Sequence, residues 1–141
     1  MPDITAGALA AQEDVFARAF AVGDPGLARA LYHPDVVYLS PTVRLFDWPA
    51  RIEGVDRALE FIALTIRHAE AIRYRAVESA IPPAGDAAFV RIEFDFGRGG
   101  RRLRSRYVVI YRYRDGLIAR QELYYDPSAS LEELPADPQS P

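Results

Sequence analysis

The sequence predicts an α+β domain, a cone-shaped fold of three N-terminal helices packed in a strongly curved antiparallel or mixed sheet. Helix patterns come first, before residue 72, and four long strand patterns then follow one another up to residue 125. With 141 residues, 50% of them hydrophobic, the chain is long enough to bury one core. We therefore expect a single domain over residues 1–127 and a proline-rich acidic tail over residues 128–141 that is partly disordered.

Composition argues against several classes of function. The formal net charge of −3 disfavours a nucleic-acid binder, whose affinity rests largely on neutralising phosphates. No apolar run reaches the roughly 18 residues of a membrane span and no secretory signal pattern is present, so we expect a cytoplasmic protein without a membrane partner. Cysteine is absent and histidine occurs only twice, which removes thiol chemistry and a dense histidine metal site. We expect neither a metal nor a cofactor.

The first two helices are predicted from residue spacing and from their end signals. Residues 5–22 carry apolar side chains at helical spacing, with Glu13 and other charged residues elsewhere on the helical wheel. The Gly-Asp-Pro sequence at 23–25 ends this helix and begins a second one, since glycine suits a helix end, aspartate an N-cap and proline the first helical position. The second helix is short, residues 26–32, because the proline after His33 biases that residue away from helical backbone.

A strand, a long loop and a third helix follow. Residues 36–40 are β-branched and aromatic and are terminated by a proline, which predicts a strand. The loop over residues 41–52 contains the only tryptophan, Trp48, among other bulky apolar groups. Such a loop needs a surface to cover, either as a flap over an opening or as a plug at one end of the core. The third helix is expected from residue 54 to about residue 71.

Four consecutive strands are separated by turn signals. The predicted strands cover residues 73–81, 87–96, 103–114 and 117–125. The glycine- and arginine-rich segment at 97–106 could in principle grip a phosphate, but it is better explained as a hairpin whose arginines keep its tip and edge soluble.

The second of these strands has two contrasting faces. Apolar even positions alternate with ionisable odd positions, which are Arg91, Glu93 and Asp95. The charged face is either solvated or lines a pocket. Periodicity alone favours solvation, because antiparallel sheets often leave one face in water.

Short signatures give the chain a family resemblance. They are Val-Gly-Asp-Pro at 22–25, His-Pro-Asp-Val-Val-Tyr at 33–38, Ile-Glu-Gly at 52–54, and a closing hairpin of Arg-Asp-Gly-Leu-Ile followed by Leu-Tyr-Tyr-Asp within 114–126. With their order, they make residues 11–126 resemble the nuclear transport factor 2-like superfamily, in its SnoaL-like and limonene-epoxide-hydrolase-like branch. The resemblance implies that the concave face of the sheet holds the chemistry.

The same resemblance implies that the charged face of the strand at 87–96 lines the concave side of the sheet. Arg91 and Glu93 then look like the arginine and the first acidic residue of the epoxide hydrolase Asp-Arg-Asp triad, and Tyr38 and Ser40 fall where that enzyme holds its water. The second aspartate falls on Leu123, so hydrolysis by the complete triad is not expected. The ketosteroid isomerase pattern is also incomplete. Its two aspartates align with Ser40 and Val109, and its tyrosine aligns with Phe16.

The predicted site combines these positions with strand alternation. We predict Glu93 as general base, with Arg91 and Tyr38 as further catalytic residues; the alternative for Glu93 is a structural ion pair with Arg91. Asp47 or Asp95 could supply the missing carboxylate. The predicted binding positions are Ser40, Trp48, Tyr107, Val109, Tyr111, Gln121, Leu123, Tyr125 and Phe16.

Two functions remain open at this point. One is a cofactor-free enzyme that acts on a small hydrophobic molecule, as a cyclase, isomerase, dehydratase or atypical epoxide-opening enzyme. The other is a non-catalytic ligand-binding or accessory protein. We also expect a homodimer through the convex sheet face, where an apolar patch would be too large to leave in water. The convex apolar positions are expected to be Val90, Ile92, Phe94, Val108 and Ile110.

Overall fold

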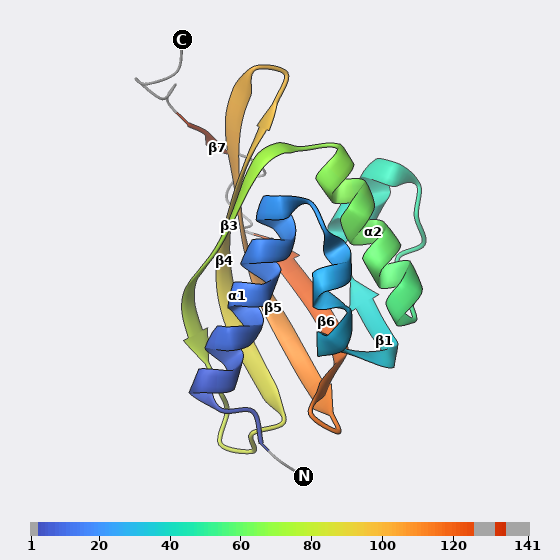
Figure 1. The fold of residues 1–141 in the computed structure, drawn as a ribbon, viewed down its shortest axis with the longest axis vertical. Helices are drawn as coiled ribbons and strands as arrows, with labels where there is room; N and C mark the ends of the chain where they lie inside the picture. The colour runs from blue at the N-terminus through green and yellow to red at the C-terminus, as the bar shows by residue number, and fades with distance from the viewer. Residues whose placement is uncertain (1–2, 126–131, 135–141) are drawn as a thin grey trace.

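A computed structural model describes residues 3–125 and 132–134 and has the predicted α+β architecture. A curved sheet has the strand order β2-β1-β6-β5-β4-β3, with β7 paired to β5, and the helices lie on its concave side (Figure 1). The strands are β1 Tyr32–Leu39, β2 Ile52–Glu53, β3 Glu70–Ala80, β4 Ala87–Arg98, β5 Arg101–Arg114, β6 Leu117–Tyr125 and β7 Glu132–Glu133. The sheet is mixed because β1 runs parallel to β6, whereas the other strand pairs are antiparallel.

The N-terminal helices begin and end at the predicted signals. Helix α1 (Ala6–Val22) is capped by the Thr5 hydroxyl, which accepts a hydrogen bond from the Ala8 amide at 3.1 Å, and it ends at Gly23 with φ 72°. The predicted second α-helix is instead a 3₁₀-helix, η1 (Pro25–Leu31), which begins at an Asp24 cap. A 3₁₀-helix suits this short segment, because the chain must become extended again at the start of β1.

The tryptophan loop packs against a helix. Its first part forms the 3₁₀-helix η2 (Pro41–Phe46), and Trp48 then lies against Phe61 of α2 (Val55–Arg67), with 5.3 Å between ring centroids. The Arg57 guanidinium lies 4.2 Å from the centroid of the Trp48 ring. These contacts seat Trp48 on the core beside α2.

The register between β4 and β5 decides which face of each strand is buried. Ile92 is paired with Tyr107 and Val90 with Val109, and all four side chains are buried in the core beneath the helices. Directly paired residues project from the same face of a sheet. Arg91, which is paired with Val108, therefore lies on the opposite, convex face, together with Glu93.

The predicted inward orientation of Arg91 and Glu93 is thus wrong, and so is the predicted convex position of Val90, Ile92 and Phe94. The cause is the two-residue turn at 99–100, which pairs every even position of β4 with an odd position of β5. With Tyr107 and Val109 inward, as predicted, only the apolar side of β4 can be inward as well. Val108 and Ile110 occupy the convex face as expected.

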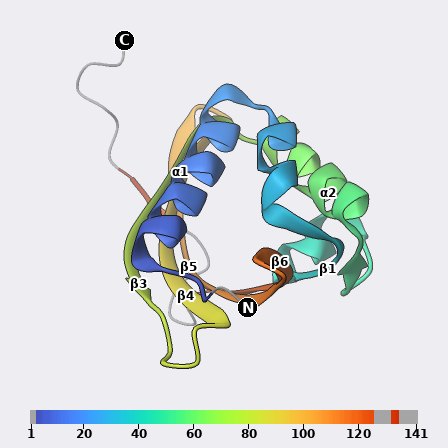
Figure 2. The same cartoon turned by 60° about the horizontal axis from the view of Figure 1, so that its bottom comes forward.

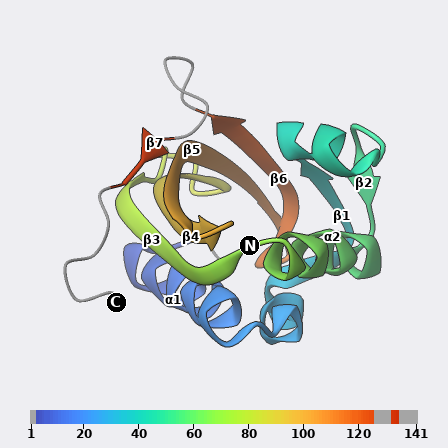
Figure 3. The same cartoon turned by 90° about the horizontal axis from the view of Figure 1, so that it is seen from above.

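Curvature brings the two ends of the sheet towards the helices. Figure 2 shows α1 and α2 facing β5 and β6 across the molecule, and Figure 3 shows β3 and β1 at opposite ends of the curve. Phe16 of α1 packs against Tyr32 and Tyr111, with ring centroids 6.0 Å and 6.2 Å apart, and so joins the helix to both β1 and β5. The core therefore lies inside the curve of the sheet.

The basic hairpin between β4 and β5 is engaged within the molecule. Arg101 forms two hydrogen bonds with the Glu133 carboxylate, at 3.0 and 2.8 Å, and Arg102 donates to the backbone oxygen of Ala71 at 3.1 Å. Glu133 belongs to β7, which pairs with β5. The tail beyond residue 135, where we predict disorder, lies outside the described residues. Within the described part of the chain, no helix is long and apolar enough to cross a membrane.

The orientation of β4 can be tested by substituting neighbouring residues. Ile92→Ala should lower the free energy of unfolding by about 2–5 kcal/mol, because it opens a cavity in the core. Arg91→Ala should lower it by less than about 1 kcal/mol, because the charge lies at the surface. Chemical denaturation followed by circular dichroism measures both values. A larger loss for Arg91→Ala than for Ile92→Ala would contradict this orientation.

Candidate functional site

A buried carboxylate occupies the concave side of the sheet. Glu13, in the middle of α1, is only 6% exposed and is the one buried acidic residue in residues 3–125. It lies on the same side of the helix as Leu9 and Phe16, four residues before it and three after it. On the helical wheel Glu13 is grouped with charged residues, which predicts an exposed side chain. Its spacing of four and three residues from Leu9 and Phe16, however, indicates a buried one.

Hydrogen bonds from two strands hold the Glu13 carboxylate. The Tyr74 hydroxyl of β3 donates to Oε1 at 2.6 Å, and the Tyr111 hydroxyl of β5 donates to Oε2 at 3.0 Å. Gln12 donates to Oε2 from Nε2 at 3.0 Å, and its own Oε1 accepts a hydrogen bond from the Tyr113 hydroxyl at 2.8 Å. This network ties α1 to the sheet through polar contacts inside the core.

Burial controls the ionisation of this cluster. Desolvation raises the pKa of Glu13 above its ordinary value of 4.5 and outweighs the lowering effect of the hydrogen bonds from Tyr74, Gln12 and Tyr111. Burial also raises the pKa of Tyr74 and Tyr111. These tyrosines therefore remain neutral hydrogen-bond donors around a carboxyl group whose proton is easier to retain than that of an exposed glutamate.

Tyrosine dominates the rest of the concave side. Of the eight tyrosines, seven pack with the core, whereas Tyr124 is exposed. Tyr32 donates to Oε1 of Gln121 at 2.5 Å, and the Tyr125 hydroxyl interacts with the Ser40 and Thr42 side chains. Tyr38 and Tyr107 are buried beside them, and their hydroxyls make no hydrogen bond to any other described residue.

Most predicted binding residues lie on this side. Tyr38, Ser40, Tyr107, Val109, Tyr111, Gln121 and Leu123 are buried along the inner strands, Phe16 faces them from α1, and the Tyr125 ring lies 5.0 Å from that of Tyr107. Trp48 does not join them, because it contacts α2 and is separated from Tyr38 by Phe61. Most of the predicted binding residues thus share the concave side, where the predicted base is absent, and of these residues Ser40 and Leu123 line a pocket.

The predicted catalytic pair is not formed. Glu93 accepts hydrogen bonds from Arg75 and, at 3.3 Å, from Arg106, on the convex face. The hydrogen bond from Arg75 is the main cause of the lowered pKa of Glu93. Arg91 instead lies 3.4 Å from Glu78. Glu93 is therefore an ionised member of a surface arginine cluster.

Neither suggested second carboxylate faces the inside. Asp95 accepts hydrogen bonds from Arg104 at 2.6 and 2.9 Å on the convex face. Asp47 is exposed at the end of η2, with φ 57°. In the described ranges, no group of three or more His, Cys, Asp or Glu side chains is arranged to hold a metal ion.

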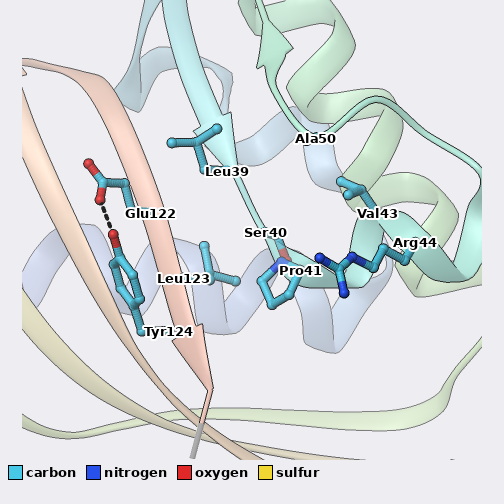
Figure 4. Close-up of a pocket in the computed structure, with 9 residues that line it drawn as sticks. All are labelled: Leu39, Ser40, Pro41, Val43, Arg44, Ala50, Glu122, Leu123 and Tyr124. Atoms are coloured by element: carbon cyan, nitrogen blue, oxygen red, sulfur yellow. Dashed lines mark hydrogen bonds between the residues drawn. The ribbon is translucent and has the colours of Figure 1, made fainter.

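A pocket of about 210 Å³ opens where β1 ends and β6 continues (Figure 4). Its apolar walls come from Leu39, Pro41, Val43, Ala50 and Leu123. Its polar lining comes from Ser40, Arg44, Glu122 and Tyr124. Ser40 and Leu123 belong to the buried inner side, whereas Glu122 and Tyr124 belong to the convex side, so the pocket lies at the mouth of the cone, where the two sides meet at the end of β1.

Comparison with known proteins identifies the type of domain. The SnoaL-like domain model matches residues 13–121. No curated protein sequence matches the chain. The structure is similar to the Δ5-3-ketosteroid isomerase from Mycobacterium sp., with a TM-score of 0.69 and 17% identity over 89% of this chain and 97% of that one.

Two further solved structures share the fold. The LEH-like epoxide hydrolase of Mycobacterium tuberculosis has a TM-score of 0.64 and 17% identity, over 82% of this chain and 80% of that chain. A proposed polyketide cyclase from Sinorhizobium meliloti has a TM-score of 0.61 and 23% identity, over 81% and 94% respectively. At these identities the similarities establish the fold and not the activity.

The raised pKa of Glu13 gives a testable pH dependence. Between 4.5 and the raised pKa, the folded state binds more protons than the unfolded chain, so the free energy of unfolding falls as pH rises. Glu13→Gln removes this dependence. As pH rises above about 4.5, the wild type should therefore lose stability relative to the variant until Glu13 is ionised in the folded state, as measured by denaturation at each pH.

Glu93→Gln is the matched control. Because the pKa of Glu93 is lowered, its contribution to stability is present above the unfolded-state pKa and is lost as pH falls through the folded-state value. The wild type should therefore gain stability relative to this variant as pH rises. Equal slopes for the two variants would contradict the assigned environments.

Proposed function

Because the chain belongs to the SnoaL-like domain family, we propose that it is a cofactor-free enzyme that moves a proton on a small hydrophobic molecule held on the concave side of its sheet. The observation that supports this proposal best is the buried Glu13 carboxylate among neutral tyrosine hydroxyls. Proton transfer is efficient when the pKa of the base approaches the working pH, and burial shifts Glu13 in that direction.

In this proposal Glu13 takes the place assigned to Glu93 from the sequence. The ionised Glu13 removes a proton from a carbon next to a carbonyl group, and the electron pair of that bond moves onto the carbonyl oxygen as an enolate. The free hydroxyls of Tyr38 and Tyr107 donate hydrogen bonds to the enolate oxygen. The protonated Glu13 then returns the proton to another carbon of the same molecule, which regenerates the base.

A single carboxylate limits the reaction class. Isomerisation or cyclisation through an enolate needs one proton carrier and donors for one oxygen, which the concave side supplies. Hydrolysis by two cooperating carboxylates needs a second acidic group. Val109 and Leu123, which pair with each other across β5 and β6, occupy the positions where the resemblance places acidic residues. We therefore favour isomerase or cyclase chemistry over epoxide hydrolysis.

One observation favours a second function, a non-catalytic binding protein. Both oxygens of Glu13 already accept hydrogen bonds from protein groups, and the side chains of Tyr111, Ile92 and Val109 are at most 1% exposed. A satisfied carboxylate in a packed core can serve stability alone. In that case the ligand would occupy only the pocket at the mouth.

The proposed general base can be tested by exchange of carbon-bound hydrogen. Glu13→Gln should slow deuterium incorporation from D₂O into a panel of cyclic enones and keto esters by about 10²–10⁴-fold, because it removes the base but keeps the side-chain size. Proton nuclear magnetic resonance measures the loss of the substrate signal. Glu93→Gln is the control and should leave the rate unchanged. Equal rates in the wild type and Glu13→Gln would overturn the role of Glu13.

We further propose that the convex face forms a homodimer, with a revised set of contacts. Phe89 and Tyr124 are 38% and 55% exposed there, and they pair with Ile110 and Val108 respectively. This apolar strip adjoins the ionic cluster of Glu93 and its arginine neighbours. Such a mixture of apolar surface and paired charge suits an interface between folded subunits.

The dimer can be tested by solution mass. The wild type should sediment at twice the mass of the 15.8 kDa chain, and Ile110→Arg should shift it to the monomer, because a charge in the apolar strip would be buried without a partner. Val22→Arg, which changes another exposed apolar residue at the end of α1, should remain dimeric. A monomeric wild type at micromolar concentration would refute the proposed interface.

A further inference from the structure

We propose that the pocket at the mouth of the cone binds a small monocarboxylic acid with an apolar body, and that Arg44 binds its carboxylate. This inference names the substrate class of the proposed function and rests on that function for the statement that the acid is turned over. The pocket combines apolar walls with one cationic group at its rim (Figure 4). A cation beside an apolar surface is complementary to an amphipathic anion.

The two charged side chains of the pocket are in different states. Glu122 is engaged through both oxygens: Oε1 accepts from Arg120, and Oε2 accepts from the Tyr124 hydroxyl at 2.5 Å. Arg44 has no ion-pair partner anywhere in residues 3–125 or 132–134. Figure 4 shows the Glu122–Tyr124 pair on the β6 wall and the Arg44 guanidinium beside Pro41. The uncompensated charge of the pocket is therefore positive.

The size of the pocket limits the ligand. A closed apolar cavity of about 150 Å³ holds one benzene molecule. The volume of about 210 Å³ here is therefore sufficient for a single substituted ring or a short branched chain. An acid of this size can place its apolar body against Val43 and Leu123 while its carboxylate stays at the rim.

The position of the pocket links it to the proposed base. The last residue of β1 is Leu39, which pairs with Glu122, and β6 continues to Tyr125 without β1 beside it. Ser40 lines the pocket and interacts with Tyr125, whose ring lies 5.0 Å from that of the inner Tyr107. In this proposal, an acid anchored by Arg44 therefore directs its apolar body towards Ser40 and Leu123, on the side of the inner tyrosines.

Binding of phenylacetate and its neutral analogue phenylacetamide tests this inference. Isothermal titration calorimetry at low salt should give about fivefold tighter binding of phenylacetate, with a difference that shrinks as salt is added, because an exposed ion pair is weak and screened. Arg44→Gln should abolish the preference for the acid without changing the affinity for the amide. Arg51→Gln is the matched control, because Arg51 is a nearby arginine already paired with Glu53 at 2.7 Å; it should retain the preference.

A second variant tests the location. Ala50→Phe should prevent binding of both probes by filling the pocket, and it should fold normally because Ala50 is exposed. Failure of the wild type to bind phenylacetate at millimolar concentration, equal affinity for the two probes, or an acid preference that survives Arg44→Gln would each overturn the inference.

The outcomes separate this inference from the proposed function. Glu13→Gln should leave phenylacetate affinity unchanged, because Glu13 does not line the pocket. Suppose that the preference for phenylacetate depends on Arg44, but that Glu13→Gln catalyses deuterium incorporation into the substrate as fast as the wild type. The acid site then stands and the proposed function fails. If Glu13 is required for exchange but the acid preference is absent, the proposed function stands and the acid site fails.

Discussion

The structure depends on the need of α1 and α2 to pack against an apolar sheet face. Both helices lie inside the curve of the sheet, so the concave positions of the inner strands must be free of uncompensated charge. This requirement decides which face of β4 points towards the helices, and Val90 and Ile92 on that face are fully buried. The arginines and acids of the same strand are then left on the convex face, where opposite charges pair across strands and water screens them.

The same constraint makes Glu13 unusual. Once its helix is packed on the sheet, its carboxylate leaves water and needs donors from the protein. Tyrosine meets both requirements, because its ring fills apolar space and its hydroxyl supplies a hydrogen bond. Tyr74 and Tyr111 do this from different strands. A polar cluster is thus built into the core without breaking its packing, and its chemistry follows from desolvation.

Much of the concave side of the sheet could be predicted because strand alternation is local. Tyr107, Val109 and Tyr111 lie inward as expected, as do Gln121 and Leu123. Alternation, however, identifies two faces without saying which is buried. For β4 the solvation argument from periodicity was correct, whereas the inward direction taken from the family resemblance was wrong. Glu13 was missed because its partners Tyr74 and Tyr111 are 61 and 98 positions away.

The sequence by itself determined the α+β class, the helix ends at Thr5 and Gly23, and the turns, because these depend on residues close together in the chain. Only the tertiary structure decided that Glu13 is buried, that Glu93 is paired with arginines from β3 and β5, and that Arg44 lines a pocket. Desolvation and ion pairing depend on which distant surfaces meet. That is the physical reason why the fold was more predictable than the site.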